Sequence, residues 1–283
     1  MKTTAFICAA LFSVAFAFGQ SAPPAADARQ LVPPSPRDGE GTGSTIVPIL
    51  IFHSTRPYIE SDTPAVRRFV ATPDTLEQEL AYLRDDGYVS ITFDDLVSHI
   101  TKNTPLPQRP VILSFDDDWE SQYTYAFPLL EKFGFTATFY IWTAVVGREH
   151  HMTWDEISTL AKAGMQIGCH TITHPYLTRV KSDVSLRREI IGARTLIEEH
   201  VGVPVTTFAY PFGQYNERVA AIVREAGFTS ARSTWPGVLH SQEGLFSLTG
   251  LLQTETTHDL AASLDTSLAR ARQKMAGGAA HAG

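Results

Sequence analysis

The chain has 283 residues, 43% of them hydrophobic and 19% charged, so it can bury one sizeable core and is neither disordered nor a coiled coil. Its formal net charge of −7 leaves no basic excess to neutralise phosphates, which excludes a typical nucleic-acid-binding protein. Two cysteines cannot form a disulfide framework.

The first 19 residues predict a secretory signal peptide. Lys2 gives a short positive start, and residues 4–18 form an uninterrupted apolar run, TAFICAALFSVAFAF. This run is shorter than the roughly 20 residues that span a bilayer, and Ala17 and Gly19 are the small residues that a signal peptidase requires. We therefore expect cleavage after Gly19, a secreted or periplasmic protein, and no transmembrane segment.

Composition divides the remaining chain into three parts. Residues 20–44 are rich in Pro, Gly, Ala and Ser and predict a flexible leader. Residues 276–283 have a similar composition and predict a disordered tail. No composition break interrupts residues 45–275, so we expect them to form a single domain.

Within this domain, short apolar runs alternate with helical patterns. The predicted strands are Val47–Phe52, Val111–Phe115, Phe135–Ile141, Gln166–Cys169, Thr206–Tyr210, Phe228–Ala231 and Leu245–Leu252. The predicted helices are Thr75–Asp85, Phe127–Phe133, Trp154–Ala163, Asp183–His200 and Glu217–Ala226. This alternation indicates an α/β fold with a parallel sheet, most simply a closed barrel, in which functional groups follow the carboxyl ends of the strands.

The first such strand end carries three carboxylates, Asp116, Asp117 and Asp118, in the run VILSFDDDWE. Adjacent carboxylates repel one another, so a buried run of this kind requires a cation among them. A solvated acidic turn is the alternative interpretation of the same residues.

The second strand end carries two histidines four residues apart, His170 and His174, in the run CHTITHP. Two imidazoles on one turn can bind a single metal ion, although isolated core and surface histidines are common. With one carboxylate from Asp117 they form a set of two histidines and one aspartate. That set leaves coordination positions open to water and suits catalysis better than a closed structural site.

Two further strand ends are ambiguous on their own. The run FAYPFG, residues 208–213, could present backbone N–H groups to an oxyanion or could be an ordinary turn. His53 ends the apolar run ILIFH, where a buried histidine with a purely structural role is the simpler interpretation.

Taken together, these runs resemble the polysaccharide deacetylases with the NodB homology domain, from about Val47 to about Leu264. SFDDD looks like the first family motif, usually TFDDG, HTITH matches the metal-binding H-S/T-x-x-H motif, and FAYPFG is similar to the R-x-P-Y-G motif. The runs VPILIFHS and TPDTLEQELAYLRDDGYVSITFDDL resemble the subgroup that acts on poly-N-acetylglucosamine. The resemblance implies a distorted (β/α) barrel of about seven parallel strands, circularly permuted so that the motif with the acid histidine comes first.

The resemblance also implies a role for each motif residue. Asp117, His170 and His174 would hold one divalent metal ion, zinc or else cobalt, nickel or manganese. Asp116 would be the general base and His53 the acid that protonates the leaving amine.

The substrate side of the site follows from the same resemblance. The backbone N–H of Phe212 would bind the oxyanion. Tyr210 belongs to the same segment, and Trp235 in the run STWPG would pack against the acetyl methyl or a sugar ring, unless it is an ordinary core aromatic.

Two positions depart from the family pattern. Ala209 stands where many members have an arginine that pairs with the base, so ionisation of the base would have to depend on the metal and on backbone donors. Asp118 replaces the usual glycine and would either support the site from behind or face solvent.

The implied activity is metal-dependent N-deacetylation of an N-acetylated polysaccharide with release of acetate, on poly-N-acetylglucosamine or alternatively on chitin-type oligomers or peptidoglycan. An O-acetyl esterase of the xylan type and a catalytically silent carbohydrate-binding protein of the same fold are the two alternatives. The sequence leaves any protein partner unidentified.

Overall fold

The computed structural model describes residues 43–280. The predicted signal peptide, residues 1–19, and nearly all of the predicted leader, residues 20–44, lie outside the described residues. Among the described helices, none combines the length and apolar character needed to cross a membrane.

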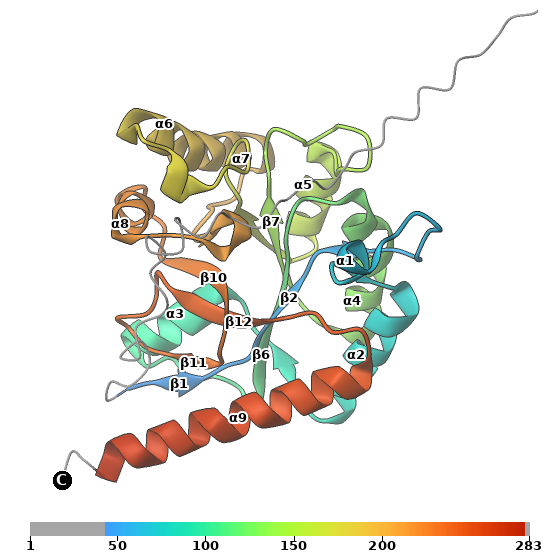
Figure 1. Cartoon of the computed structure of the whole chain (residues 1–283), viewed down its shortest axis with the longest axis vertical. Coiled ribbons are helices and arrows are strands. Elements are labelled where there is room, and N and C mark those ends of the chain that lie inside the picture. The colour runs from blue at the N-terminus through green and yellow to red at the C-terminus, as the bar shows by residue number, and fades with distance from the viewer. Residues whose placement is uncertain (1–42, 281–283) are drawn as a thin grey trace, which may run out of the picture.

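Seven parallel strands form a closed barrel at the centre of the fold (Figure 1). Its order is β2-β12-β10-β9-β8-β7-β6, and β6 pairs again with β2 to close the ring. The strands are β2 Ile49–Phe52, β6 Pro110–Phe115, β7 Thr138–Ile141, β8 Gln166–Cys169, β9 Thr207–Ala209, β10 Ser230–Pro236 and β12 Leu248–Leu252. The predicted (β/α) barrel of about seven parallel strands is therefore confirmed.

Short strands extend the barrel at its margins. β5 (Val89–Ser90) pairs with the start of β6, and β1 (Thr45–Ile46) pairs with β11 (Leu239–His240) in antiparallel orientation. β3 (Ser54–Thr55) pairs with β4 (Val70–Ala71) directly after β2, and this pair fixes the chain that leaves the carboxyl end of that strand.

Helices connect the strands and cover the barrel from outside (Figure 1). The α-helices are α1 Pro64–Arg67, α2 Pro73–Asp85, α3 Phe93–Lys102, α4 Phe127–Phe133, α5 Trp154–Lys162, α6 Asp183–Arg187, α7 Ala193–Val201, α8 Glu217–Glu225 and α9 Thr257–Ala280. Two π-helical turns, η2 Gln122–Ala126 and η4 Arg188–Gly192, continue into α4 and α7, and two 3₁₀ turns are η3 Leu177–Arg179 and η5 Pro211–Gly213.

The last helix differs from the sequence prediction. The boundary expected at residue 275 falls within α9, which runs from Thr257 to Ala280, so the first part of the predicted tail is helical. Alanine has the highest helix propensity of all residues, and the run AGGAA contains enough of it to continue a helix that has already begun.

The barrel wall separates two layers of apolar side chains. Along β2, Ile49 and Ile51 face the inner cluster, whereas Leu50 and Phe52 face the outer cluster beneath the helices. This alternation follows from the two-residue period of a strand. Phe93 of α3 packs into the inner cluster and its backbone N–H donates to Gln166 at the start of β8, so the amino end of the barrel is filled and the carboxyl end remains for chemistry.

Candidate metal centre and active site

The strand register brings the predicted site residues to one level of the barrel. Phe52, the last residue of β2, pairs with Phe115, the last residue of β6. His53 and Asp116 follow these two residues directly, so they are neighbours. Cys169 pairs with Phe208, which places His170 beside Ala209. Segments that are far apart in sequence therefore meet at the carboxyl end of the barrel.

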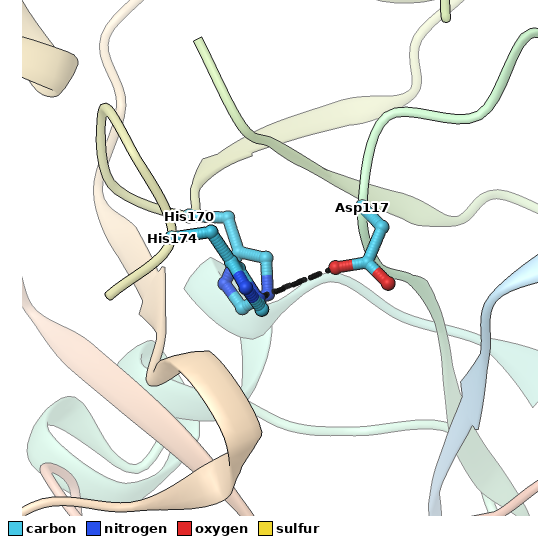
Figure 2. Close-up of side chains that lie close together, drawn as sticks. All are labelled: Asp117, His170 and His174. Atoms are coloured by element: carbon cyan, nitrogen blue, oxygen red, sulfur yellow. Dashed lines mark hydrogen bonds and ion pairs between the residues drawn. The ribbon is translucent and has the colours of Figure 1, made fainter. Parts of the chain in front are cut away.

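Asp117, His170 and His174 converge on one point (Figure 2). The Oδ1 of Asp117 lies 3.5 Å from Nε2 of His170 and 3.4 Å from Nε2 of His174. The two Nε2 atoms are 3.1 Å apart. One ligand atom from each residue thus forms a nearly equilateral triangle.

The dimensions of this triangle fit a divalent metal ion. Zinc binds imidazole nitrogen and carboxylate oxygen at about 2.0–2.2 Å, so two such ligands at a tetrahedral angle lie about 3.3–3.5 Å apart. Two of the three separations, 3.4 and 3.5 Å, fall within that range, and the separation of the two Nε2 atoms, 3.1 Å, is slightly shorter. Two imidazole lone pairs aimed at one point would repel each other unless a proton or a cation lies between them, so the donor set favours an ion.

The charges of the three residues are strongly coupled. Burial alone would raise the pKa of Asp117, but His170, His53 and His174 outweigh it and hold the pKa well below its usual range. Burial and the neighbouring charge of His170 lower the pKa of His174 to about 4. The carboxylate of Asp117 and the neutral imidazole of His174 are the protonation states in which these groups bind metal. Burial alone would lower the pKa of His170, but its hydrogen bond to Asp117 and the charges of Asp116 and Asp117 raise it, so metal binding at His170 would release a proton.

Backbone and side-chain partners orient both histidines. The Nδ1 of His170 donates to the carbonyl oxygen of Ala209 at 2.7 Å, which leaves Nε2 free to bind a metal. The loop that carries His174 is held by Glu189 of η4, whose carboxylate accepts hydrogen bonds from Ile172 N and from the backbone N–H and the hydroxyl of Thr173. Glu189 was not predicted from the sequence, because nothing near it marks a site.

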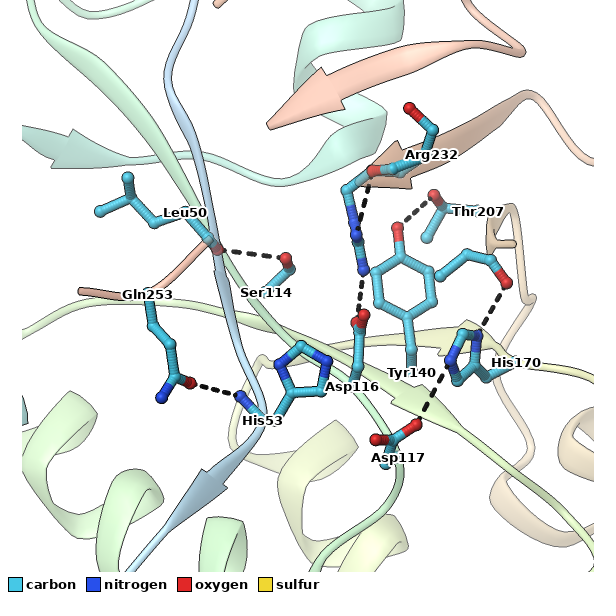
Figure 3. Close-up of polar contacts among 12 residues, drawn as sticks. Leu50, His53, Ser114, Asp116, Asp117, Tyr140, His170, Thr207, Arg232 and Gln253 are labelled. Atoms are coloured by element: carbon cyan, nitrogen blue, oxygen red, sulfur yellow. Dashed lines mark hydrogen bonds and ion pairs between the residues drawn. The ribbon is translucent and has the colours of Figure 1, made fainter. Parts of the chain in front are cut away.

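Asp116 forms a buried ion pair with Arg232 of β10 (Figure 3). The side chains of Arg232 and Asp116 are only 1% and 4% exposed, and the guanidinium also lies over the ring of Tyr140, 5.0 Å from its centroid. Burial alone would lower the pKa of Arg232, but the charge of Asp116 raises it.

This pair corrects the inference drawn from Ala209. Arg232 and Ala209 are register partners on adjacent strands, so the cation expected on β9 is supplied by β10 at the same level of the barrel. The candidate base therefore has a guanidinium partner after all. Because strand pairing decides which residue lies beside Ala209, the motif alone could not identify it.

His53 lies beside the two aspartates (Figure 3), close enough to Asp117 to contribute to its lowered pKa. Its backbone N–H donates to Oε1 of Gln253 at 3.0 Å, and its ring meets the edge of Phe69 with 4.9 Å between centroids. The amide of Gln122 donates to the carbonyl oxygens of both His53 and Asp116, at 3.0 and 2.6 Å, and so ties the two strand ends together.

The imidazole of His53 has an unused nitrogen. Its Nδ1 is buried and has no hydrogen-bond partner among the described residues. A buried polar atom without a partner is rare and costs free energy unless water or a ligand satisfies it.

Asp118 does not face solvent. Its side chain is fully buried, and neither carboxylate oxygen has a hydrogen-bond partner in the described part of the chain. Burial, with the neighbouring charges of Glu156 and Asp117, raises its pKa well above the usual range. Of the two alternatives offered for this residue, the structure therefore excludes the exposed one.

The three residues predicted on the substrate side lie in different surroundings. Phe212, in η5, contacts the ring of His174 with 4.6 Å between centroids. Tyr210 is buried, its hydroxyl donates to the carbonyl of Phe246 at 3.0 Å and its backbone N–H donates to the carbonyl of Arg232 at 3.0 Å, so both of its donors are already engaged within the protein. Trp235 is half-buried on β10, three residues beyond Arg232, and packs against the outer apolar cluster.

Aromatic rings continue from the metal ligands in a row that sequence analysis missed. The ring of Trp142 lies 5.0 Å from that of His174, and His151 contacts both Trp142 and Trp119. Trp142 follows β7 directly, as Asp116 follows β6, and this position is the signal that could have identified it. Half-buried aromatic rings beside a polar centre are suited to contact sugar faces.

Comparison with known proteins places these features in a family. The polysaccharide deacetylase family model matches residues 102–231, which include Asp116, the three candidate metal ligands and Phe212 but end one residue before Arg232. The Bacillus subtilis (strain 168) protein YxkH, whose name assigns it only provisionally to the polysaccharide deacetylases, is 26% identical over 202 residues, 71% of this chain and 69% of that protein.

Two further likenesses extend the comparison. A poly-β-1,6-N-acetyl-D-glucosamine N-deacetylase of Staphylococcus aureus (strain MRSA252) is 22% identical over 60% of this chain and 63% of that protein, which is less than two thirds of its length. The structure of the Streptococcus pyogenes deacetylase PplD in complex with acetate has the same fold, with a TM-score of 0.70, 22% identity, and coverage of 77% of this chain and 98% of that one. On this evidence the chain contains a polysaccharide deacetylase domain, a hydrolase domain that the family model matches over residues 102–231.

Proposed function

We propose that this protein is an exported, metal-dependent N-deacetylase of poly-N-acetylglucosamine. The observation that carries the proposal is the triangle of Asp117, His170 and His174, with sides of 3.1–3.5 Å, beside a candidate base and a candidate acid. A carbohydrate-binding protein without catalysis would need neither an open metal site nor a buried ion pair on a neighbouring carboxylate.

Asp117, His170 and His174 would hold the cation, and their nitrogen and oxygen donors suit zinc. A divalent ion held there would supply a Lewis acid for the acetyl carbonyl and lower the pKa of a water molecule. Loss of any one ligand should therefore abolish catalysis without removing the rest of the site.

Asp116 accepts the proton of the attacking water. Arg232 positions this carboxylate by binding one of its oxygens and compensates its charge in a buried environment. A base must lie within reach of the proton it takes, and Asp116 is adjacent in the chain to the ligand Asp117. Arg232 is thus a positioning residue and not itself a catalytic one.

His53 donates a proton to the amide nitrogen as the carbon–nitrogen bond breaks, because an amine is too basic to leave as an anion. The backbone N–H of Phe212 donates a hydrogen bond to the oxyanion that develops on the acetyl carbonyl. Trp142, whose ring lies beside that of His174, and Trp235 are candidates for contact with the sugar or the acetyl methyl.

The choice of polymer and the export are supported by separate observations. The Staphylococcus aureus relative is named for poly-β-1,6-N-acetyl-D-glucosamine, and the candidate acid lies after the first barrel strand, as the resemblance to that subgroup predicts. Residues 1–19 have the composition of a cleavable signal. Amino-terminal sequencing of the mature protein from culture fluid or periplasm should begin at Gln20, and an uncleaved cell-associated product would contradict export.

The central experiment measures acetate release from β-1,6-linked N-acetylglucosamine oligomers, with chitin oligomers and acetylated xylan as comparison substrates. Zinc-loaded protein should act on the first substrate, lose activity with a chelator and recover it when zinc is restored. Preference for acetylated xylan would favour the O-acetyl esterase. Metal-loaded protein that releases acetate from none of these substrates would contradict every enzymatic alternative.

His53→Ala tests the acid. N-deacetylation should fall by about 10²–10⁴-fold, the range typical of general acid–base groups. Hydrolysis of an aryl acetate by the same variant should fall much less, because an aryl oxide leaves without a proton. Equal activity of the variant and the wild type on the amide would remove His53 from the mechanism.

A further inference from the structure

A cavity of about 270 Å³ adjoins the candidate acid His53, because two of the residues that line it contact His53. It lies where the chain before β4 meets the chain after β12. Residues that line it include Arg67, Phe69, Leu252, Gln253, Glu255 and Asp259. None of these residues was singled out by the sequence motifs.

Two of the lining residues also contact His53. The Phe69 ring meets the imidazole edge with 4.9 Å between centroids, and the Gln253 side chain accepts the hydrogen bond of the His53 backbone N–H. The cavity and the candidate acid therefore share a wall, and an occupant of the cavity would be next to a group bound at the catalytic centre.

The backbone fixes this wall in place. The carbonyl oxygen of Phe69 accepts a hydrogen bond from Ser54 N at 3.0 Å, directly after His53. The backbone N–H of Gln253 donates to the carbonyl of Ile51 at 2.8 Å, two residues before His53. A cavity wall tied to the barrel on both sides of the candidate acid is preorganised and loses little entropy when it binds a ligand.

The lining has the chemistry of a saccharide site. Phe69 and Leu252 are 45% and 41% exposed, unusually high values for large apolar side chains, and they offer apolar surface to the C–H face of a sugar ring. Arg67 and Arg68 supply donors, whereas Glu255 and Asp259 supply acceptors, for the hydroxyl groups at the rim. Two positive and two negative charges balance, so the lining suits an uncharged sugar.

We propose that this cavity is a subsite for the neutral N-acetylated sugar next to the one that is deacetylated, with Phe69 as the stacking platform. The proposal deepens the proposed function and rests on it, since it assumes that a glycan chain lies across the catalytic centre. It makes the enzyme selective for oligomers over single sugars.

The test uses the full chain loaded with zinc and β-1,6-linked N-acetylglucosamine oligomers of increasing length, starting from the single sugar. For the wild type, kcat/KM should rise when the second sugar is added. In Phe69→Ala, kcat/KM on the longer oligomers should fall about 10-fold, the effect expected for loss of one aromatic contact, while kcat/KM on the single sugar stays close to that of the wild type. Leu252→Ala, which removes the second apolar side chain of the lining, should show the same pattern with a smaller loss.

Val89→Ala is the matched control, because Val89 is 50% exposed on β5 beside the start of β6, away from the site, and its variant should match the wild type on every oligomer. An equal loss on the single sugar and on the oligomers in Phe69→Ala would show that Phe69 only orients His53, and it would overturn the subsite. Unchanged kinetics on all lengths would overturn it as well.

Binding measurements separate this proposal from the proposed function. If the zinc-loaded wild type releases no acetate, the enzymatic proposal fails, and calorimetric titration with the longest oligomer decides the subsite. Binding that weakens about 10-fold in Phe69→Ala would support a saccharide subsite in a non-catalytic protein. Absence of binding, or equal binding by the wild type and the variant, would overturn it.

Discussion

Left-handed backbone conformations gather mainly in two regions of the described chain, and the residue types that adopt them differ between the two. At the ends of helices most of these residues are glycines with φ between 72° and 87°, namely Gly87, Gly134, Gly164, Gly202 and Gly227, and Asn103 at the end of α3 is the exception. After the carboxyl ends of the barrel strands most are residues with side chains and φ between 54° and 76°, namely Asp117, Asp118, Thr171, His174 and Phe212, and Gly213 is the exception.

The difference shows where this fold accepts conformational strain. A residue with a side chain costs about 1–2 kcal/mol in this conformation, and glycine avoids that cost. Strained residues persist where surrounding contacts hold them in place, and they cluster at functional sites. The strand ends also bury the charges of Asp116, Asp118 and Arg232, a second cost that the helix ends do not carry.

Arg232→Met should produce the largest change at the strand ends. The variant leaves Asp116 buried without its partner, and breaking a buried ion pair costs about 3–5 kcal/mol of unfolding free energy. Deacetylation should fall too, because the base loses its orientation. Urea unfolding and acetate release measure the two effects.

The double variant Asp116→Asn/Arg232→Met separates stability from chemistry. It removes both charges, so it should regain most of the lost stability while remaining inactive. If the double variant were no more stable than Arg232→Met, electrostatic pairing would not be what holds Arg232 in the barrel.

His174→Gly tests whether the strained conformation of residue 174 is kept because its imidazole binds the metal ion. Glycine suits the φ of 54° but supplies no ligand. Replacing a residue that hydrogen-bonds to a metal ligand lowers metal affinity about 10–100-fold, so removing the ligand itself should lower the affinity by more than about 100-fold. Metal content after dialysis and the rise of Tm on adding zinc report the loss; retention of one zinc per chain would rule out the triangle as the metal site.

The contrast between the two regions also explains which features could be predicted from the sequence. Helix ends follow local rules that can be recognised in the sequence: Asn216 caps α8 by accepting from Val219 N, Pro73 begins α2, and glycines with positive φ follow several helices. The metal ligands could be predicted because Asp117 and the two histidines each follow an apolar strand directly, and parallel strand ends meet at one edge.

The features that were missed depend on strand pairing and on packing over long distances. Arg232 follows the strand predicted over Phe228–Ala231 directly, but only the pairing of β9 with β10 places it beside Asp116. Glu189 supports the His174 loop from a helix that appears ordinary in sequence. Burial of Asp118 likewise depends on the chain around Met152, whose backbone N–H donates to the Asp118 carbonyl.

Asp118→Gly should stabilise the protein. Asp118 has a φ of 59° and a buried carboxyl group without a partner among the described residues, and glycine removes both costs, for a gain of about 2 kcal/mol. Burial raises the pKa of this carboxyl above its value in the unfolded chain, so the folded state binds the proton more tightly. As pH rises above the unfolded value, Asp118 therefore lowers the free energy of unfolding by an increasing amount. The gain should therefore be larger at pH 8 than at pH 5, as measured by urea unfolding.

Asp118→Asn is the control for this effect, because it removes the titrating group but keeps a side chain at positive φ. It should show the smaller gain, with little dependence on pH. A loss of stability in Asp118→Gly would mean that the carboxyl has a favourable role, such as holding Asp117 in place, and metal affinity would then fall with it.

Gly202→Ala should produce the smallest effect and the cleanest measure of strain alone. Gly202 ends α7 with a φ of 74°, and a Cβ added there would meet no atom within 4 Å, so the substitution creates no clash. The only cost is the left-handed conformation, about 1 kcal/mol of unfolding free energy, while metal content and acetate release stay at wild-type values. An unchanged free energy of unfolding would show that this conformation is not costly in the fold, and the strain assigned to Asp118 and His174 would then have to be attributed to buried charge instead.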